Sequence, residues 1–134
     1  MSERHVSWIG YEAATPDIRG NLRELGFVVD ESIDASSGLA QVIEGSPVAV
    51  FLGHSILPGE GQAIPRTLRY KSGSQIAVYT VERIFDLDRR IPVFILAPKE
   101  VDPSDYIIAG ATALINTSTI SIDKFLQLLK RHSV

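Results

Sequence analysis

Short apolar runs alternate with amphipathic segments along the 134 residues of the chain. Continuous apolar runs of strand length occur at residues 48–52 and 91–96. Such runs are typical of central parallel strands that helices cover on both faces. Shorter apolar runs at residues 6–10, 27–29 and 113–115 predict three further strands. We therefore expect an α/β domain with a five-stranded parallel sheet.

The first two segments between these strands predict helices that pack on the sheet. Thr15 has the residue type of an N-cap, and Pro16 and Asp17 would then lie in the first turn. The inward face of this helix is predicted from helical spacing: Ile18, Leu22 and Leu25. A second helix follows the candidate N-caps Asp34, Ser36 and Ser37. Its predicted buried face consists of Leu39, Val42 and Ile43.

Three more helices complete the alternation. The spacing of apolar residues predicts one helix over about residues 74–87, Asp102 caps a short one, and an apolar stripe marks the last over residues 122–129. Right-handed crossovers place the helices on both faces of the sheet. We expect a flavodoxin-like, doubly wound (βα)5 sandwich with strand order 2-1-3-4-5.

One connection is longer than the usual loop of about 2 to 6 residues. Residues 59–73, between the third strand and the third helix, form a long insertion in what we predict to be a single domain spanning residues 1–134. This insertion carries Arg66, Arg69 and Lys71 against one acid, Glu60. It leaves the carboxyl end of a strand, where ligands bind in open α/β sheets. A small anionic ligand or an acidic partner fits these charges, and a solvated loop is the alternative.

Composition narrows the function classes. The chain is 45% hydrophobic and 22% charged, has a net charge of −3 and contains no cysteine. These values exclude nucleic-acid binding as a bulk electrostatic effect, and they exclude disulfides, thiolate metal sites and a cysteine nucleophile. The three histidines show no metal-ligand spacing, so we expect neither metal nor cofactor. With no apolar run of membrane-spanning length and no signal-peptide core, we expect a cytoplasmic protein that does not bind membranes.

Several segments resemble a bacterial response-regulator receiver domain. Residues 57–61 (Leu-Pro-Gly-Glu-Gly) resemble the turn after the receiver's third strand, and residues 25–29 resemble the entry to its second strand. Residues 90–97 resemble its fourth strand, and residues 109–115 resemble the passage into its fifth. The resemblance spans nearly the whole chain, and it implies the fold predicted above and a role in two-component signal transduction.

The same resemblance locates the receiver's phosphorylation pocket, and every position there departs from the family pattern. The acid pair falls on Gly10 and Tyr11, with Glu12 one step later, and the acceptor aspartate falls on His54. The positions of the strand-four threonine, the strand-five lysine and the switch aromatic are Ala97, Thr117 and Leu114. In receivers the acids hold magnesium, which prefers carboxylate oxygens. We therefore expect a pseudo-receiver that does not accept phosphate on an aspartate.

The expected function is that of a non-enzymatic regulatory module that acts by protein contact, as a homodimer or against another domain. Receivers commonly dimerise through their fourth helix, fifth strand and fifth helix. By resemblance, the residues of that surface are Tyr106, Ile108, Lys124 and Gln127.

Three alternatives stay open. The basic insertion favours a sensor of small anionic ligands. The degenerate wing domains of large pyridoxal-phosphate-dependent decarboxylases also resemble this architecture, but that interpretation requires a domain cut from a larger enzyme. An enzyme that uses Glu12, His54 and Ser55 is the weakest alternative, because these residues do not make a complete acid–base or nucleophile set.

Overall fold

The computed structural model describes residues 3–12, 17–61 and 64–134. Its strands form one parallel sheet in the order β2-β1-β3-β4-β5, as predicted from the alternation of apolar runs. The strands are β1 (Arg4–Ile9), β2 (Phe27–Ser32), β3 (Ala49–Gly53), β4 (Val93–Ala97) and β5 (Ala113–Asn116). The central strands β3 and β4 are buried along their entire length, which explains their unbroken apolar sequences.

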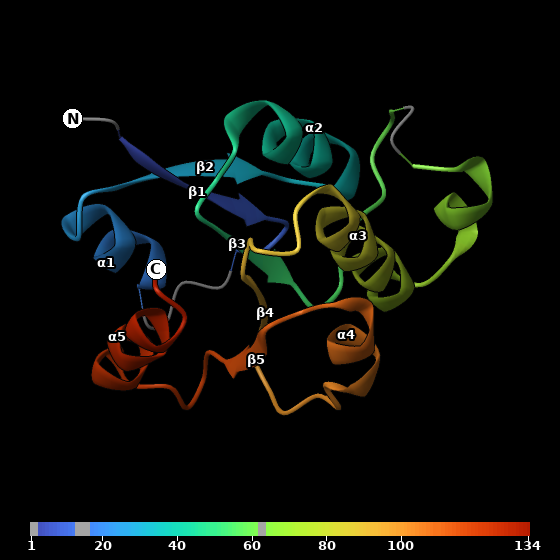
Figure 1. Cartoon of the computed structure of the whole chain (residues 1–134). Coiled ribbons are helices and arrows are strands. Elements are labelled where there is room, and N and C mark those ends of the chain that lie inside the picture. Colours follow the sequence, from blue (N-terminus) through green and yellow to red (C-terminus); the bar gives the residue numbers. More distant parts are fainter. Residues whose placement is uncertain (1–2, 13–16, 62–63) are drawn as a thin grey trace.

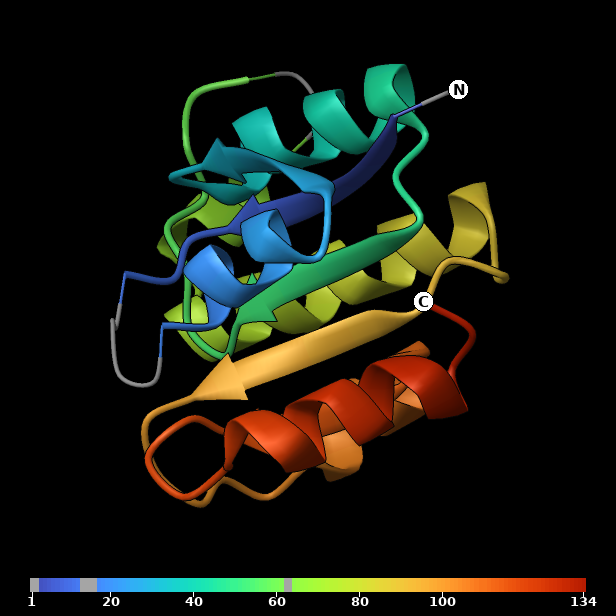
Figure 2. The same cartoon turned by 90° about the vertical axis from the view of Figure 1, so that its left-hand side faces the viewer.

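Helices cover both faces of this sheet (Figure 1). They are α1 (Ile18–Glu24), α2 (Ala35–Gly45), α3 (Gly73–Leu87), α4 (Ser104–Ala109) and α5 (Ile122–Arg131). Helices α1 and α5 lie on one face, and α2, α3 and α4 lie on the other (Figure 2). The predicted flavodoxin-like, doubly wound arrangement is therefore confirmed.

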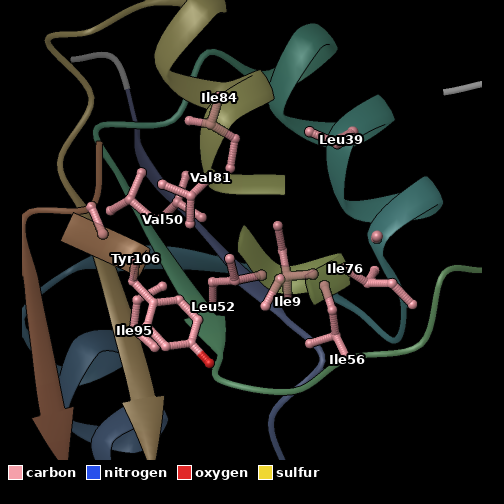
Figure 3. Packing of buried hydrophobic residues seen from close by; sticks show 14 of the residues in the cluster. Ile9, Leu39, Val50, Leu52, Ile56, Ile76, Val81, Ile84, Ile95 and Tyr106 are labelled. Carbon is pink, nitrogen blue, oxygen red and sulfur yellow. The ribbon is translucent and has the colours of Figure 1, made fainter. Parts of the chain in front are cut away.

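Each face of the sheet has its own hydrophobic cluster, because successive strand residues point to opposite faces. Trp8 packs toward α1 and α5, where its ring stacks on Phe51 with a centroid separation of 5.7 Å. The next residue, Ile9, packs toward α2 and α3, where Figure 3 shows it near Ile56 and Ile76. Trp8 is thus a core residue, as its position in the first apolar run predicts.

The first helix differs from its predicted form. Thr15 and Pro16 lie outside the described residues, and Asp17 acts as the N-cap by accepting a hydrogen bond from the Gly20 amide at 2.9 Å. Leu25 and Ile43, both predicted to be buried, are exposed. Leu25 is the C-cap of α1, in the turn that leads into β2, and Ile43 lies at the outer edge of the apolar stripe of α2.

The insertion at residues 59–73 is more ordered than a plain loop. It contains a short 3-10 helix, η1 (Arg66–Tyr70), and the preceding Ile64 is buried in the α2–α3 cluster. Near its start, Asp34 at the N-cap of α2 forms a parallel bridge with Leu57. At the other end, the Ile56 amide donates to the Gly73 carbonyl at 3.2 Å, so both ends of the insertion are held close to the carboxyl edge of the sheet. In the described ranges, no helix combines the length and apolar character needed to cross a membrane.

Candidate functional site

The predicted pocket positions all lie at the carboxyl edge of the sheet. β1, β3 and β4 end at Ile9, Gly53 and Ala97, so the residues that follow these strands come together there. Backbone hydrogen bonds continue the strand pairing beyond β3 and β5: the His54 amide donates to Leu96 at 2.9 Å, and the Thr117 amide donates to Ala97 at 2.8 Å. These hydrogen bonds fix the backbone of His54 and Thr117 relative to β4.

A hydroxyl contact joins the β1 end of this edge to the β5 end. The Tyr11 hydroxyl is hydrogen-bonded to Thr117 Oγ1, and Thr117 Oγ1 also lies 3.2 Å from the Ala97 carbonyl, to which it can donate. Trp8 Nε1 donates to the Tyr11 carbonyl at 2.6 Å and holds the start of this turn. Both hydroxyl-bearing residues are buried. Three predicted pocket positions, Tyr11, Ala97 and Thr117, thus meet in one neutral hydrogen-bonded cluster.

Two glycines let the ends of β1 and β3 approach each other closely. Gly10 has a φ of +64°, and a Cβ built there would lie 2.5 Å from the side chain of Ile56. A Cβ on Gly53 would lie 2.6 Å from the Gly10 carbonyl oxygen. Ile56 is itself buried, so an aliphatic side chain packs directly against the position that the resemblance assigns to the first acid.

His54 and Glu12 are not brought together as an acid–base pair. His54 is half-buried, and its Nδ1 is buried without a hydrogen-bond partner among the described residues. The Tyr106 hydroxyl donates to the His54 backbone carbonyl at 2.6 Å. Burial raises the pKa of the Tyr106 phenol, with a smaller contribution from Asp105, so this donor stays protonated at neutral pH. Within the described ranges, no hydrogen bond links the His54 ring to Glu12 or Ser55.

The residues at this edge do not fit the magnesium ion that a receiver pocket would hold. Mg²⁺ takes oxygen ligands in near-octahedral geometry, usually with one or two carboxylates. Among the predicted pocket positions, only Glu12 carries a carboxylate. The described part of the chain contains no group of three or more histidine, aspartate or glutamate residues that could hold a metal ion.

A cavity of about 750 Å³ opens on the β2 side of the Tyr11–Thr117 contact. Arg69 and Lys71 of the insertion line it, together with Glu12. Arg66 does not line it, although it shares η1 with Arg69. The structure thus separates the three basic residues that the sequence grouped together.

Of the four residues predicted for a dimer surface, three lie at the surface and one is buried. Ile108 is 84% exposed on α4, and Lys124 and Gln127 line a groove beside β5 and α5. Tyr106 is only 4% exposed, because its ring packs in the α2–α3 cluster, the same one that contains Ile64. Tyr106 therefore fixes α4 to the end of β3 and does not contribute a contact surface.

Two functional features were not predicted from the sequence. The contact between Tyr11 and Thr117 joins residues that are 106 positions apart. No local pattern in the sequence marks Ile56, because its position above Gly10 depends on the close approach of two turns. The signal in the sequence for this close approach is the glycine at each strand end. Gly10 and Gly53 have no side chain, and each is followed by a large residue.

Known solved structures share this architecture. No model of a known protein family matches the chain, and neither does any curated protein. A two-component response regulator from Clostridium difficile is 13% identical, with a TM-score of 0.73, and the match covers 98% of this chain and 96% of that one. A CheY-like response regulator receiver domain protein from Methanospirillum hungatei is 15% identical, with a TM-score of 0.67 and coverage of 98% of both chains.

A third match is to part of a longer protein. NtrX from Brucella abortus is 19% identical, with a TM-score of 0.68, and the match covers 98% of this chain and 27% of NtrX. The chain therefore has the fold of response regulator receiver domains. At these identities the likeness establishes the fold alone.

Proposed function

We propose that this chain is a pseudo-receiver, a signalling module with a receiver fold that acts by protein contact and accepts no phosphoryl group on an aspartate. The supporting observation is the buried contact between Tyr11 and Thr117. By resemblance, these positions carry an acid and a lysine in a working receiver. Neutral hydroxyls lack both the carboxylate that attracts magnesium and the ammonium that holds a phosphoryl oxygen.

A phosphorylation assay tests this proposal directly. The protein is incubated with acetyl phosphate and magnesium and then analysed by intact mass, alongside a receiver domain that has the full acid pocket. We expect an adduct on the control receiver and none on this chain. An adduct that peptide mapping places on an aspartate overturns the proposal. An adduct that disappears in the His54→Ala variant identifies His54 as the acceptor and overturns it equally.

The proposed contact surface is formed by α4, β5 and α5, and we infer a second copy of the chain as its partner. β5 is an edge strand, and α4 and α5 flank it from opposite faces of the sheet (Figure 1). Ile108 projects from α4 beside Asp102 and Asp105, while Lys124 and Arg131 line the groove on the α5 side. A two-fold axis would place the acids of one copy against the cations of the other.

Light scattering at two protein concentrations tests the proposed dimer. Ile108→Glu should abolish the concentration-dependent increase in mass, because a charge would replace an exposed apolar side chain of the proposed contact surface. Ile43→Glu is the matched control, since Ile43 is also exposed but lies on α2, away from β5. A monomer at both concentrations, or equal loss in the two variants, contradicts this assignment of the surface.

The proposal treats residues 1–134 as one receiver-like domain with an insertion at 59–73. A place in a two-component pathway and a cytoplasmic location remain predictions from the sequence.

A further inference from the structure

The cavity on the β2 side of the sheet has the position and size of a ligand site. Its volume of about 750 Å³ lies within the range of small-molecule sites. In this strand order the direction of winding reverses between β1 and β3, and open α/β sheets bind ligands at the carboxyl ends of the strands at that point. Gly10 and Ser55, which follow these two strands, both line the cavity.

One wall of this cavity is cationic: Arg69 and Lys71 line it and have hydrogen-bond donors that remain available to a ligand. Arg69 uses Nη2 to donate to the Gly61 carbonyl at 3.3 Å. In the described ranges, neither Arg69 nor Lys71 has a carboxylate within ion-pair distance. Gly73, the first residue of α3, lines the same wall, and the first turn of α3 contains no acid that would offset the positive end of the helix dipole.

The lining also carries hydrogen-bond acceptors. Glu31 accepts from both Arg19 and Arg23, so its charge is already balanced. Glu12 is exposed at the rim and forms no ion pair with any described residue. A ligand with hydroxyl groups can therefore donate to Glu12 while its anionic group faces the cationic wall. An anion without hydroxyl groups would contact only the cationic residues and would leave Glu12 without a hydrogen-bond donor.

Two exposed aliphatic side chains also belong to the lining. Ile33 and Leu57 are 75% and 71% exposed, and both line the cavity mouth. Exposed aliphatic side chains around a polar cavity can cover the weakly polar face of a sugar or a base. The cavity thus presents three different surfaces at fixed positions.

We propose that this cavity binds a phosphorylated sugar, either free or as part of a mononucleotide. The phosphate lies against Arg69 and Lys71, the sugar hydroxyls donate to Glu12, and Ile33 and Leu57 cover the remainder of the ligand. Guanidinium and ammonium groups together suit a phosphate monoester, because arginine supplies a planar pair of donors and lysine a compact charge.

Calorimetric titration of the full chain tests the site with four probes: ribose 5-phosphate, adenosine 5′-monophosphate, ribose and inorganic phosphate. We expect both phosphate esters to bind, inorganic phosphate to bind more weakly, and ribose not to bind. Tighter binding of the mononucleotide than of ribose 5-phosphate assigns the apolar rim to a base. Equal affinity for the two esters assigns the site to a sugar phosphate.

Charge-removing variants locate the site. Arg69→Gln and Lys71→Gln should each weaken binding of ribose 5-phosphate by at least about tenfold, because each removes a charge-assisted hydrogen bond to the phosphate. Arg66→Gln is the matched control, since it removes the same charge from η1 but lies outside the cavity lining. Fluorescence of the sole tryptophan, Trp8, confirms that each variant is folded.

Three results would overturn this inference. One is that neither phosphate ester binds. Another is that folded Arg69→Gln and Lys71→Gln variants keep the original affinity. The third is that Arg66→Gln weakens binding as much as Lys71→Gln, since that would indicate diffuse attraction to the basic insertion. The outcome is independent of the phosphorylation and light-scattering experiments, which probe other residues.

Discussion

At the scale of single residues, Gly53 controls how closely the ends of β1 and β3 can approach. A Cβ at this position would lie 2.6 Å from the Gly10 carbonyl oxygen, which cannot shift without moving the end of β1. We expect Gly53→Ala to lower the free energy of unfolding by about 1–3 kcal/mol, as crowding in a packed core usually does. Urea denaturation followed by Trp8 fluorescence measures this change.

The control for this substitution is Gly45→Ala. Nothing lies within 4 Å of a Cβ built on Gly45, the last residue of α2, and its φ is not positive. Alanine there should be neutral or should stabilise the protein by about 0.5–1 kcal/mol, because it reduces the freedom of the unfolded chain. Equal destabilisation by the two substitutions would show that the close approach at Gly53 is not the cause.

At the scale of secondary-structure elements, the Tyr11–Thr117 contact ties the turn after β1 to the end of β5. Tyr11→Phe and Thr117→Val each remove one hydroxyl of a buried pair. Each single substitution should cost about 0.5–1.5 kcal/mol in the free energy of unfolding. The double variant should cost less than their sum by about 0.5 kcal/mol or more, because residues in direct contact are coupled. Urea denaturation of all four proteins gives the coupling, and strict additivity would contradict it.

The elements differ in how much of them can be predicted from the sequence. β3 and β4 were predictable because both of their faces are buried, so every residue of each run is apolar. Leu25 and Ile43 were assigned wrongly because helical spacing identifies a stripe but does not show where the covering surface ends. Tyr106 was assigned to a surface because nothing in its local sequence indicates the His54 carbonyl that its hydroxyl reaches.

The candidate site was predictable only in outline for a related reason. Strand ends can be placed from apolar runs, so the sequence located Gly10, His54 and Thr117 at one edge of the sheet. Which side chains meet there depends on rotamers and on turns such as the one that carries Ile56. The separation of Arg66 from Arg69 likewise depends on η1, a single short helix within a segment that had no clear periodicity.

At the scale of the whole molecule, two kinds of titrating group should make the free energy of unfolding depend on pH: aspartates with lowered pKa values and a histidine with a raised pKa. Arg90 lowers the pKa of Asp88, and Ser104 lowers the pKa of Asp102. Because the folded pKa values are depressed, these contributions are present above the ordinary aspartate pKa of about 3.9 and are lost as the pH falls through the lower folded values. Acid should therefore destabilise the fold below about pH 4.

His5 acts in the opposite direction at higher pH. Its Nδ1 lies 2.7 Å from an Asp30 carboxylate oxygen, and this hydrogen bond, with Glu3 nearby, raises the pKa of His5 above 6.5. Because the folded pKa is raised, the contribution is complete below 6.5 and is lost as the pH rises through the folded value. The free energy of unfolding should thus decrease as the pH rises from about 6.5 through the raised pKa of His5.

Two variants test this origin of the pH dependence. His5→Gln removes the titrating group, and Asp30→Asn removes the carboxylate that raises its pKa. Both should flatten the decrease in the free energy of unfolding over that pH interval, as measured by urea denaturation at a series of pH values. An unchanged slope in both variants would assign the pH dependence to other groups.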